Sequence, residues 1–285
     1  MITNYPEWTE LTLEMRDLLH PRFQMLKEGI SEFTFANLYL FRKTYGYSIT
    51  RVENSLYIFS GRTGNKRFFM LPFGLPPRPI LDELFTRFDY IKGVSENQVE
   101  TLAAMGCRVE EDRDNFDYLY LRKELAELNG RKYHKKRTHI NSFLQNYSFR
   151  GAFIVEQTVN DAMYILNAWR AKRDRDDDYA AAREALELMD TLQLCGSMVY
   201  VEDKPAAYTI GEELAAGICY AVHFEKAISE YKGVYQFINQ CFAALLPEKY
   251  VTINREQDLG DAGLRKAKMS YNPCGFVKKY KVYPV

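Results

Sequence analysis

The densest group of polar side chains in the sequence lies near its carboxyl end. Asn254, Glu256 and Asp258 follow a short apolar stretch that is typical of a buried strand, and strand alternation would point all three to one side. Arg265 and Lys268 are three residues apart on a short expected helix, so they share one of its faces. Carboxylates opposite cations can hold an α-amino group or take a proton from an attacking amine. The sequence therefore predicts Glu256 and Asp258 as catalytic residues and the other three as substrate-binding residues.

Two interpretations of this polar run stay open. It is either such a site or a salt-bridged loop that only attaches the last strand to the core. The same choice applies to His223, which ends the apolar stretch 217–224. A histidine there is either a general base that touches the substrate or a core residue whose ring nitrogens are satisfied by hydrogen bonds.

The clearest helix in the sequence covers residues 233–246, where apolar side chains recur at steps of three and one. It lies between two expected strands, the second of which leads into the polar run. Helix N-termini and unpaired strand N–H groups both favour negative charge. The residues at the start of this helix are therefore predicted substrate contacts, and they are Tyr231, Lys232 and Tyr235.

Composition excludes several classes of protein. The chain has 285 residues, and its 38 Lys and Arg residues are balanced by 38 Asp and Glu residues, so no bulk field attracts nucleic acid or anionic membranes. Apolar runs are too short to span a bilayer, and the first residues do not form a secretory signal. The five cysteines and four histidines do not cluster, so we expect reduced thiols and no metal. We expect a cytoplasmic protein without a transmembrane segment.

Charge is nevertheless unevenly distributed along the chain. Residues 128–155 contain no acid and are rich in Lys and Arg. The basic segment Arg131–Arg137 is a candidate contact for tRNA phosphates, and a solvated helix face is the alternative. We interpret residues 126–148 as a basic helical connector between two domains.

The elements on either side of this connector occur in similar order, with helices and antiparallel strands in both halves. This predicts an α+β protein with an N-terminal domain at 1–125 and a C-terminal domain at 149–285 that carries the site. In the first half, a helix is expected over residues 31–45, with Ser31 as its N-cap and Gly46 as its end. That half lacks a comparable polar cluster in sequence, so a mainly structural role is expected for it.

The order of elements in the second half resembles the acyltransferase fold of the N-acetyltransferase (GNAT) superfamily. In that fold, the strands before and after the long helix separate, and the gap between them holds an activated carbonyl. Members that use coenzyme A usually carry a Gln/Arg-x-x-Gly-x-Gly/Ala turn at the start of the helix. This chain has one glycine there, Gly233, and a bulky Tyr235 where a small residue is wanted. The departure counts against coenzyme A as donor.

A more specific resemblance comes from the stretch Asn254–Gly260 followed by Gly263–Pro273. It resembles the C-terminal signature of a bacterial family related to the C-terminal domain of phosphatidylglycerol lysyltransferase. Ser31–Tyr45 and Tyr231–Tyr235 resemble further segments of that family. The resemblance implies two tandem GNAT-like domains, each with a mixed, mostly antiparallel sheet flanked by helices. It also implies a relationship to Fem-type peptidyltransferases, which use aminoacyl-tRNA.

The combined expectation is an acyltransferase, of the aminoacyl-transfer type, that moves an activated acyl or aminoacyl group to an amine or hydroxyl acceptor. Aminoacyl-tRNA and acyl-CoA are the two donors considered; no cofactor is assigned, and no metal is expected. Backbone N–H groups in the gap would stabilise the oxyanion. Three alternatives remain: a non-catalytic small-molecule-binding protein that keeps the fold, an acyl-CoA-dependent N-acyltransferase, and an RNA-binding module that uses the basic connector.

Overall fold

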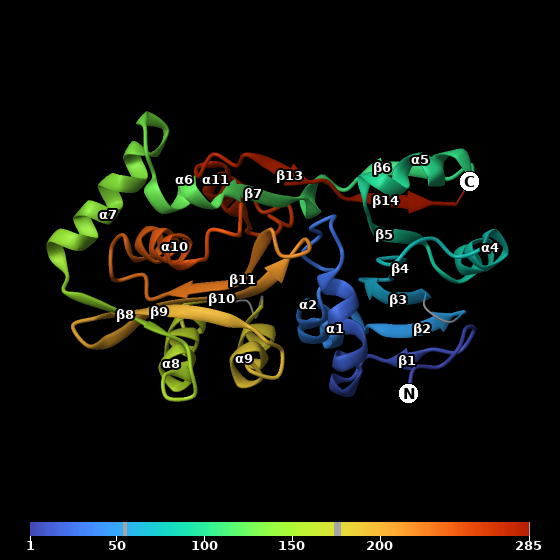
Figure 1. Ribbon diagram of the computed structural model, residues 1–285, viewed down its shortest axis with the longest axis horizontal. Coiled ribbons are helices and arrows are strands. Elements are labelled where there is room, and N and C mark those ends of the chain that lie inside the picture. Colours follow the sequence, from blue (N-terminus) through green and yellow to red (C-terminus); the bar gives the residue numbers. More distant parts are fainter. Residues whose placement is uncertain (54–55, 174–177, 285) are drawn as a thin grey trace. The chain divides into compact units, whose positions relative to one another are not determined.

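The computed structural model describes residues 1–53, 56–173 and 178–284 of the chain (Figure 1). The chain folds as two compact units that are not contiguous in sequence. Unit 1 consists of Met1–Asp117, Gln257–Asp261 and Phe276–Val285, and unit 2 of Tyr118–Glu256 and Ala262–Gly275. Each unit is built on a mixed sheet flanked by helices, so the predicted α+β class is confirmed.

Unit 1 holds the following elements in chain order: β1 (Thr9–Glu10), η1 (Leu13–Met15), α1 (Arg16–Gln24), α2 (Phe35–Leu40), α3 (Arg42–Tyr45), β2 (Ser48–Val52), β3 (Leu56–Thr63), β4 (Lys66–Met70), α4 (Arg78–Arg87), β5 (Tyr90–Val94), α5 (Glu96–Ala104), β6 (Arg108–Glu111), η2 (Arg113–Asn115) and β14 (Tyr280–Tyr283). The described strands form a seven-stranded sheet in the order β1-β2-β3-β4-β5-β14-β6. Leu81 and Leu84 of α4 and Leu102 of α5 are fully buried in the core on this sheet.

The remaining elements form the sheet of unit 2 and its helices: β7 (Asp117–Leu121), α6 (Arg122–Glu127), η3 (Arg131–Tyr133), α7 (His134–Asn146), β8 (Phe149–Phe153), α8 (Val159–Arg170), α9 (Tyr179–Glu187), β9 (Cys195–Val201), β10 (Lys204–Leu214), β11 (Cys219–Ala227), α10 (Val234–Leu245), β12 (Thr252–Asn254), α11 (Ala262–Met269) and β13 (Gly275–Val277). The first residue of β7 and the last two of β13 belong to unit 1. The described strands form a second seven-stranded sheet in the order β13-β7-β12-β11-β10-β9-β8.

The helices of unit 2 cover both faces of its sheet, with α8 and α9 on one side and α10 on the other (Figure 1). The predicted helix at 233–246 is α10, and its apolar stripe is buried as the spacing requires. Val234, Ile238 and Phe242 are all at most 7% exposed. This helix connects β11 to β12, which pair in parallel.

The two units repeat one arrangement. In unit 1 the parallel pair β4 and β5 is joined through α4, as β11 and β12 are joined through α10 in unit 2. In each sheet, a strand from elsewhere in the sequence lies next to the second strand of the pair. The chain's last strand, β14, lies between β5 and β6, and β7 lies between β12 and β13. Each sheet is therefore completed by a strand from the other half of the sequence.

The helix expected over residues 31–45 is shorter and begins later. Thr34, not Ser31, is its N-cap, because the Thr34 hydroxyl accepts a hydrogen bond from the Asn37 N–H. The segment is broken at Phe41 into α2 and α3, and Gly46 ends it as predicted, in the left-handed conformation at φ 62°.

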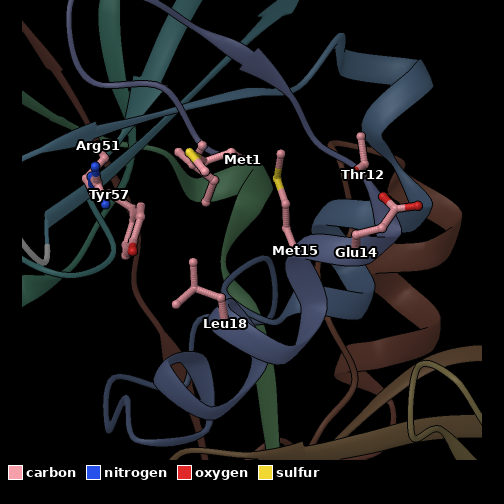
Figure 2. Close-up of a pocket in the computed structure, with 8 residues that line it drawn as sticks. Met1, Thr12, Glu14, Met15, Leu18, Arg51 and Tyr57 are labelled. Carbon is pink, nitrogen blue, oxygen red and sulfur yellow. The ribbon is translucent and has the colours of Figure 1, made fainter.

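A pocket of about 460 Å³ opens on unit 1 (Figure 2). Met15 of η1 and Leu18 of α1 form part of its mostly apolar wall, and Glu14 and Arg51 are the charged groups among the residues that line it. None of the residues predicted to do chemistry lines it.

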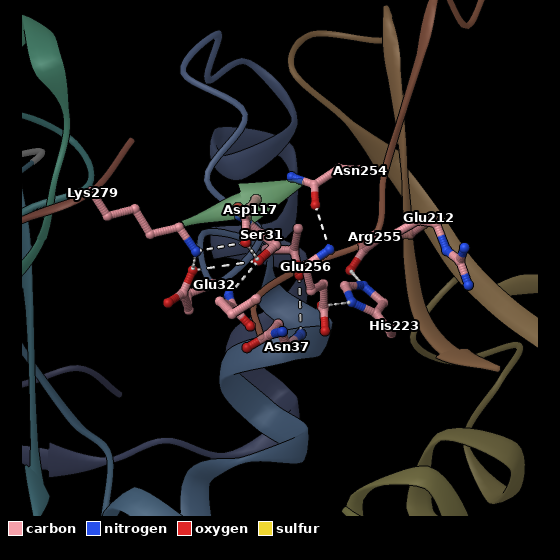
Figure 3. A network of polar contacts seen from close by, with 12 residues as sticks. Ser31, Glu32, Asn37, Asp117, Glu212, His223, Asn254, Arg255, Glu256 and Lys279 are labelled. Carbon is pink, nitrogen blue, oxygen red and sulfur yellow. Dashed lines mark hydrogen bonds and ion pairs between the residues drawn. The ribbon is translucent and has the colours of Figure 1, made fainter. Parts of the chain in front are cut away.

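Unit 1 also contains a fully buried cluster of charges, drawn in Figure 3. The ammonium of Lys279 donates to Glu32 and, at 2.7 Å, to Asp117. Asp117 also accepts the Ser31 N–H at 2.9 Å and the Ser31 hydroxyl at 2.8 Å. The sequence of the first half shows no such cluster, because the members are far apart in the sequence and Lys279 comes from the second half. The mainly structural role expected for the first half stays a prediction.

This cluster yields a prediction about stability. Lys279→Met leaves two buried carboxylates without their cation, so it should lower the free energy of unfolding by about 3–5 kcal/mol. Urea unfolding followed by circular dichroism measures the loss. Lys278→Met is the matched control, because the Lys278 side chain is 43% exposed and its ion pair with Glu111 is long, at 3.5 Å. Its effect should stay within about 0.5 kcal/mol. Equal effects of the two variants would contradict a structural role for the cluster.

Candidate functional site

The site of unit 2 begins where β11 and β12 separate. The two strands pair over three positions, from Cys219 opposite Thr252 to Ala221 opposite Asn254. Beyond that point β12 ends, whereas β11 continues to Ala227. The strands therefore part as expected for the GNAT arrangement, and among the described residues no strand lies beside β11 on that edge after Ala221.

A β-bulge places His223 at this point. Val222 pairs with Gly211 of β10 and Phe224 pairs with Ile210, so His223 is the extra residue on β11. A bulge bends the strand and redirects a side chain. The strands approach so closely here that a Cβ at Gly211 would lie 1.8 Å from the Ala221 carbonyl oxygen, which only glycine avoids.

Both ring nitrogens of His223 meet a carboxylate (Figure 3). Nδ1 lies 2.7 Å from Oε1 of Glu256, and Nε2 lies 2.9 Å from Oε1 of Glu212. The side chains of His223 and Glu212 are 1% and 4% exposed, and that of Glu256 is 17% exposed. The ring is thus held from both ends, next to a carboxylate that solvent can still reach.

This environment fixes the charge of the ring. Burial by itself would lower the pKa of His223, but the hydrogen bonds and the charges of Glu212 and Glu256 outweigh it and raise the pKa to about 10. His223 is therefore an imidazolium at neutral pH, and both of its N–H groups donate. The cluster contains two carboxylates and one cation.

The backbone of Glu256 is held in an uncommon conformation. Its φ is 54°, in the left-handed region, and its N–H donates to Oδ1 of Asn254 at 2.7 Å. Such backbone conformations are frequent at functional sites, where the surroundings enforce them. The positive φ also ends the strand alternation that was expected to continue to Asp258.

A second ionic contact bridges the separated strands. Arg255, which directly precedes Glu256, donates at 2.9 Å to Glu225 of β11, which lies two residues after His223. The Arg255 guanidinium lies 5.0 Å from the centre of the Tyr271 ring. The ammonium of Lys268, on α11, donates to the Arg255 carbonyl. Lys268 thus supports the segment that carries Glu256.

The remaining predicted residues have separate surroundings. Asp258 belongs to unit 1, where its carboxylate accepts from Arg113 at 3.3 Å and from the Gly260 N–H at 2.9 Å. Arg265 lies half-buried on α11 of unit 2. The structure therefore groups His223, Asn254 and Glu256 directly, whereas a catalytic role for Asp258 stays a prediction.

The start of α10 is closely packed. A Cβ at Gly233, whose φ is +90°, would lie 2.3 Å from the carbonyl oxygen of His139 on α7. The Tyr235 hydroxyl accepts the Ala227 N–H of β11 at 3.2 Å. Tyr231 packs edge-on against Tyr147, and Lys232 is exposed. The glycine at this turn is thus required for the close packing of α10 against α7. The Tyr235 hydroxyl is the hydrogen-bond acceptor of the last N–H of β11.

The basic connector uses part of its charge within unit 2. Lys132 donates to Glu124 at 2.7 Å, and Arg137 donates to the carbonyl of Gly130 at 2.7 Å. The Lys136 ammonium lies 3.6 Å from the centre of the Tyr271 ring. Burial and the nearby Arg255 lower the pKa of Lys136 to about 8. Arg131 and Lys135 are exposed. Contact of this segment with tRNA stays a prediction.

Glu212 is the member of the site that sequence reasoning missed. It follows the apolar stretch at 206–211 on β10, and a carboxylate in a buried strand is costly unless it is paired. A glutamate in such a strand therefore indicates a buried partner, and this could have identified Glu212 from the sequence. In the described part of the chain, no group of three or more His, Cys, Asp and Glu side chains could hold a metal ion. None of the described helices has the length and apolar character needed to cross a bilayer.

Comparisons with known proteins find the same fold in other structures. The structure is similar to that of a conserved protein of unknown function from Bacteroides thetaiotaomicron, with 30% identity, all of both chains covered and a TM-score of 0.87. It is similar to L-PGS from Bacillus licheniformis, with 13% identity, 86% and 90% of the chains covered and a TM-score of 0.58. It is also similar to FemX, with 9% identity, 98% and 97% covered and a TM-score of 0.58.

Two helix-flanked sheets, each with a parallel strand pair joined through a helix, define a tandem GNAT-like fold. Residues 23–283 match the family described as phosphatidylglycerol lysyltransferase, C-terminal. The chain belongs to that family, as the resemblance in its carboxyl-terminal stretch predicted.

The raised pKa of His223 predicts how stability depends on pH. In the unfolded chain the ring loses its proton near its ordinary value of about 6.5, whereas in the folded chain it keeps the proton to about 10. The contribution of the His223 charge to the free energy of unfolding is complete below about pH 6.5 and is lost as the pH rises to about 10. Between these values the free energy of unfolding should fall by up to about 1.4 kcal/mol per pH unit.

Urea unfolding at a series of pH values from 6 to 10 measures this slope. In His223→Gln the component due to the ring should disappear. The exposed His134→Gln is the control and should keep the slope of the wild type. A slope that is the same in all three proteins would show that His223 does not hold a proton over this range.

Proposed function

We propose that the protein transfers an aminoacyl group from an activated ester, of the kind carried by aminoacyl-tRNA, to an amine or hydroxyl acceptor. Membership of the lysyltransferase C-terminal family and the tandem fold support this class of reaction. The observation that carries the proposal is the buried cluster of Glu212, His223 and Glu256 at the point where β11 and β12 separate.

The charge of the cluster favours a donor with an amino group. Two carboxylates around one imidazolium leave one net negative charge in a mostly desolvated place. An ammonium group is attracted there, and the attraction is stronger than in water because the surroundings are less polarisable. The α-amino group of an aminoacyl ester is such a cation at neutral pH. Acyl-CoA has no comparable cation next to its carbonyl.

Two packing features further disfavour coenzyme A. The His139 carbonyl lies against Gly233 at the start of α10, where a pyrophosphate would need open N–H groups. Tyr235 takes the Ala227 N–H of β11, which a bound donor would otherwise use. An acyl-CoA-dependent reaction is thus the weaker candidate for this site.

In the proposed reaction, the acceptor attacks the ester carbonyl, a C–N or C–O bond forms, and the ester C–O bond breaks. The leaving alcohol takes up a proton. Glu256 holds the amino group of the donor or accepts the proton of the acceptor, a role worth about 10²–10⁴-fold in rate. N–H groups of β11 beyond Ala221 face the oxyanion, and Lys232 and Arg265 meet phosphate or carboxylate groups of the substrates.

The first test removes the charge of the proposed base. Glu256→Gln keeps the shape of the side chain but cannot hold an ammonium or accept a proton, so transfer should fall by about 10²-fold or more. The assay uses tRNAs charged with radiolabelled amino acids, with phosphatidylglycerol vesicles and free amines offered as acceptors. Glu248→Gln, which changes an exposed glutamate of unit 2, is the control. Unchanged transfer by Glu256→Gln would contradict the proposal.

The second test compares donors. A non-hydrolysable aminoacyl-adenosine should raise the midpoint of thermal unfolding, because a ligand at 100 times its Kd adds about 2.7 kcal/mol of stability. Acetyl-CoA at the same concentration should leave the midpoint unchanged. The reverse pattern would replace the aminoacyl donor by an acyl-CoA.

A further inference from the structure

We propose that Glu212 is a positioning residue of this site, which holds the His223 ring so that the ring in turn fixes the carboxylate of Glu256. The inference rests on the proposed function, because it assigns Glu212 a part in substrate binding at the same site. Glu212 itself lies on the far side of the ring from Glu256, so it acts through His223.

The His223 ring is held at both of its nitrogens. Glu212 and Glu256 bind opposite nitrogens of one imidazole, at 2.9 and 2.7 Å. A ring bonded at both nitrogens cannot flip or turn without breaking a hydrogen bond. Its orientation therefore sets where Oε1 of Glu256 lies, and Glu212 sets the orientation of the ring.

The backbone on both strands brings Glu212 to the His223 ring. Glu212 directly follows Gly211, where a Cβ would clash with the Ala221 carbonyl oxygen of β11, and His223 is the bulged residue opposite. Both features bring one buried side chain to the other across the two strands. A carboxylate buried to this degree costs several kcal/mol unless it is paired. The strand pair is therefore shaped to bring this carboxylate to the ring.

Two carboxylates hold the proton on the His223 ring. Glu212 of β10 and Glu256, after β12, act on it directly. The nearby Glu225 of β11 and Arg255 neutralise one another as an ion pair. Removing the Glu212 charge leaves Glu256 as the single carboxylate that holds the proton on His223. The ring then loses part of its preference for the doubly donating form that both hydrogen bonds require.

The neighbouring glutamate provides a matched control. Glu213 is the next residue of β10 and, because strand side chains alternate, it points to the other face. There it accepts from Lys249 and from the Tyr250 hydroxyl. Glu213→Gln removes the same charge from the same strand without touching His223.

The experiment follows the His223 ring by nitrogen NMR of the full chain, with the four histidines assigned by substitution. In the wild type and in Glu213→Gln the ring should stay protonated up to about pH 10. In Glu212→Gln its titration midpoint should fall by about 1–3 pH units. The non-hydrolysable aminoacyl-adenosine should bind at least about tenfold more weakly to Glu212→Gln than to Glu213→Gln, a difference of about 1.4 kcal/mol.

The outcomes separate this inference from the proposed function. If Glu212→Gln leaves both the titration and the binding unchanged, Glu212 does not position the site. If the titration shifts but the binding does not, Glu212 only stabilises the fold, and the inference is overturned. If no aminoacyl compound binds the wild type or any variant, the proposed function fails, and the positioning role fails with it. The titration of the His223 ring still shows in that case whether Glu212 holds the ring.

Discussion

A buried imidazolium between two carboxylates is the interaction on which the candidate site depends. Taking such charges out of water costs several kcal/mol for each, and the cost is recovered only when the partners meet at hydrogen-bond distance. The local backbone meets that condition. His223 stands on a bulge, Gly211 admits the close approach of two strands, and Glu256 accepts a positive φ. These three local features together bring the side chains of the cluster to hydrogen-bond distance.

A similar principle shapes unit 1. The buried charges of Glu32, Asp117 and Lys279 come from three segments that are far apart in the sequence. Lys279 directly precedes β14, the strand that completes the sheet of unit 1, and Asp117 begins β7, which joins the sheet of unit 2. All three charged residues belong to unit 1. Neither half of the sequence contains all the strands of its own sheet.

Local patterns predicted the elements but not these pairings. The stripe of α10 and the end of α3 at Gly46 follow from side-chain spacing and from glycine's tolerance of positive φ, both of which are local. The fold class followed from the order of elements. The exchange of β7 and β14 depends on contacts across more than a hundred residues, which no periodicity encodes.

The site shows the same limit. Asn254 and Glu256 were identified because polar residues gather after a strand. Glu212 stands at the end of an apolar stretch, next to Glu213, and its place in the site is recognised only through its contact with His223. Strand alternation failed at Asp258 because Glu256 leaves the extended conformation. For His223, the two interpretations converge: it is a core histidine satisfied at both nitrogens, and it also belongs to the site.

The central claim is that the cluster receives the amino group of the donor. The most direct measurement is the nitrogen chemical shift of the His223 ring while a non-hydrolysable aminoacyl-adenosine is added to the wild-type protein. The account predicts that the Nδ1 resonance, which faces Glu256, moves with saturable dependence on ligand concentration. Saturable binding that leaves both ring resonances of His223 in place would contradict it.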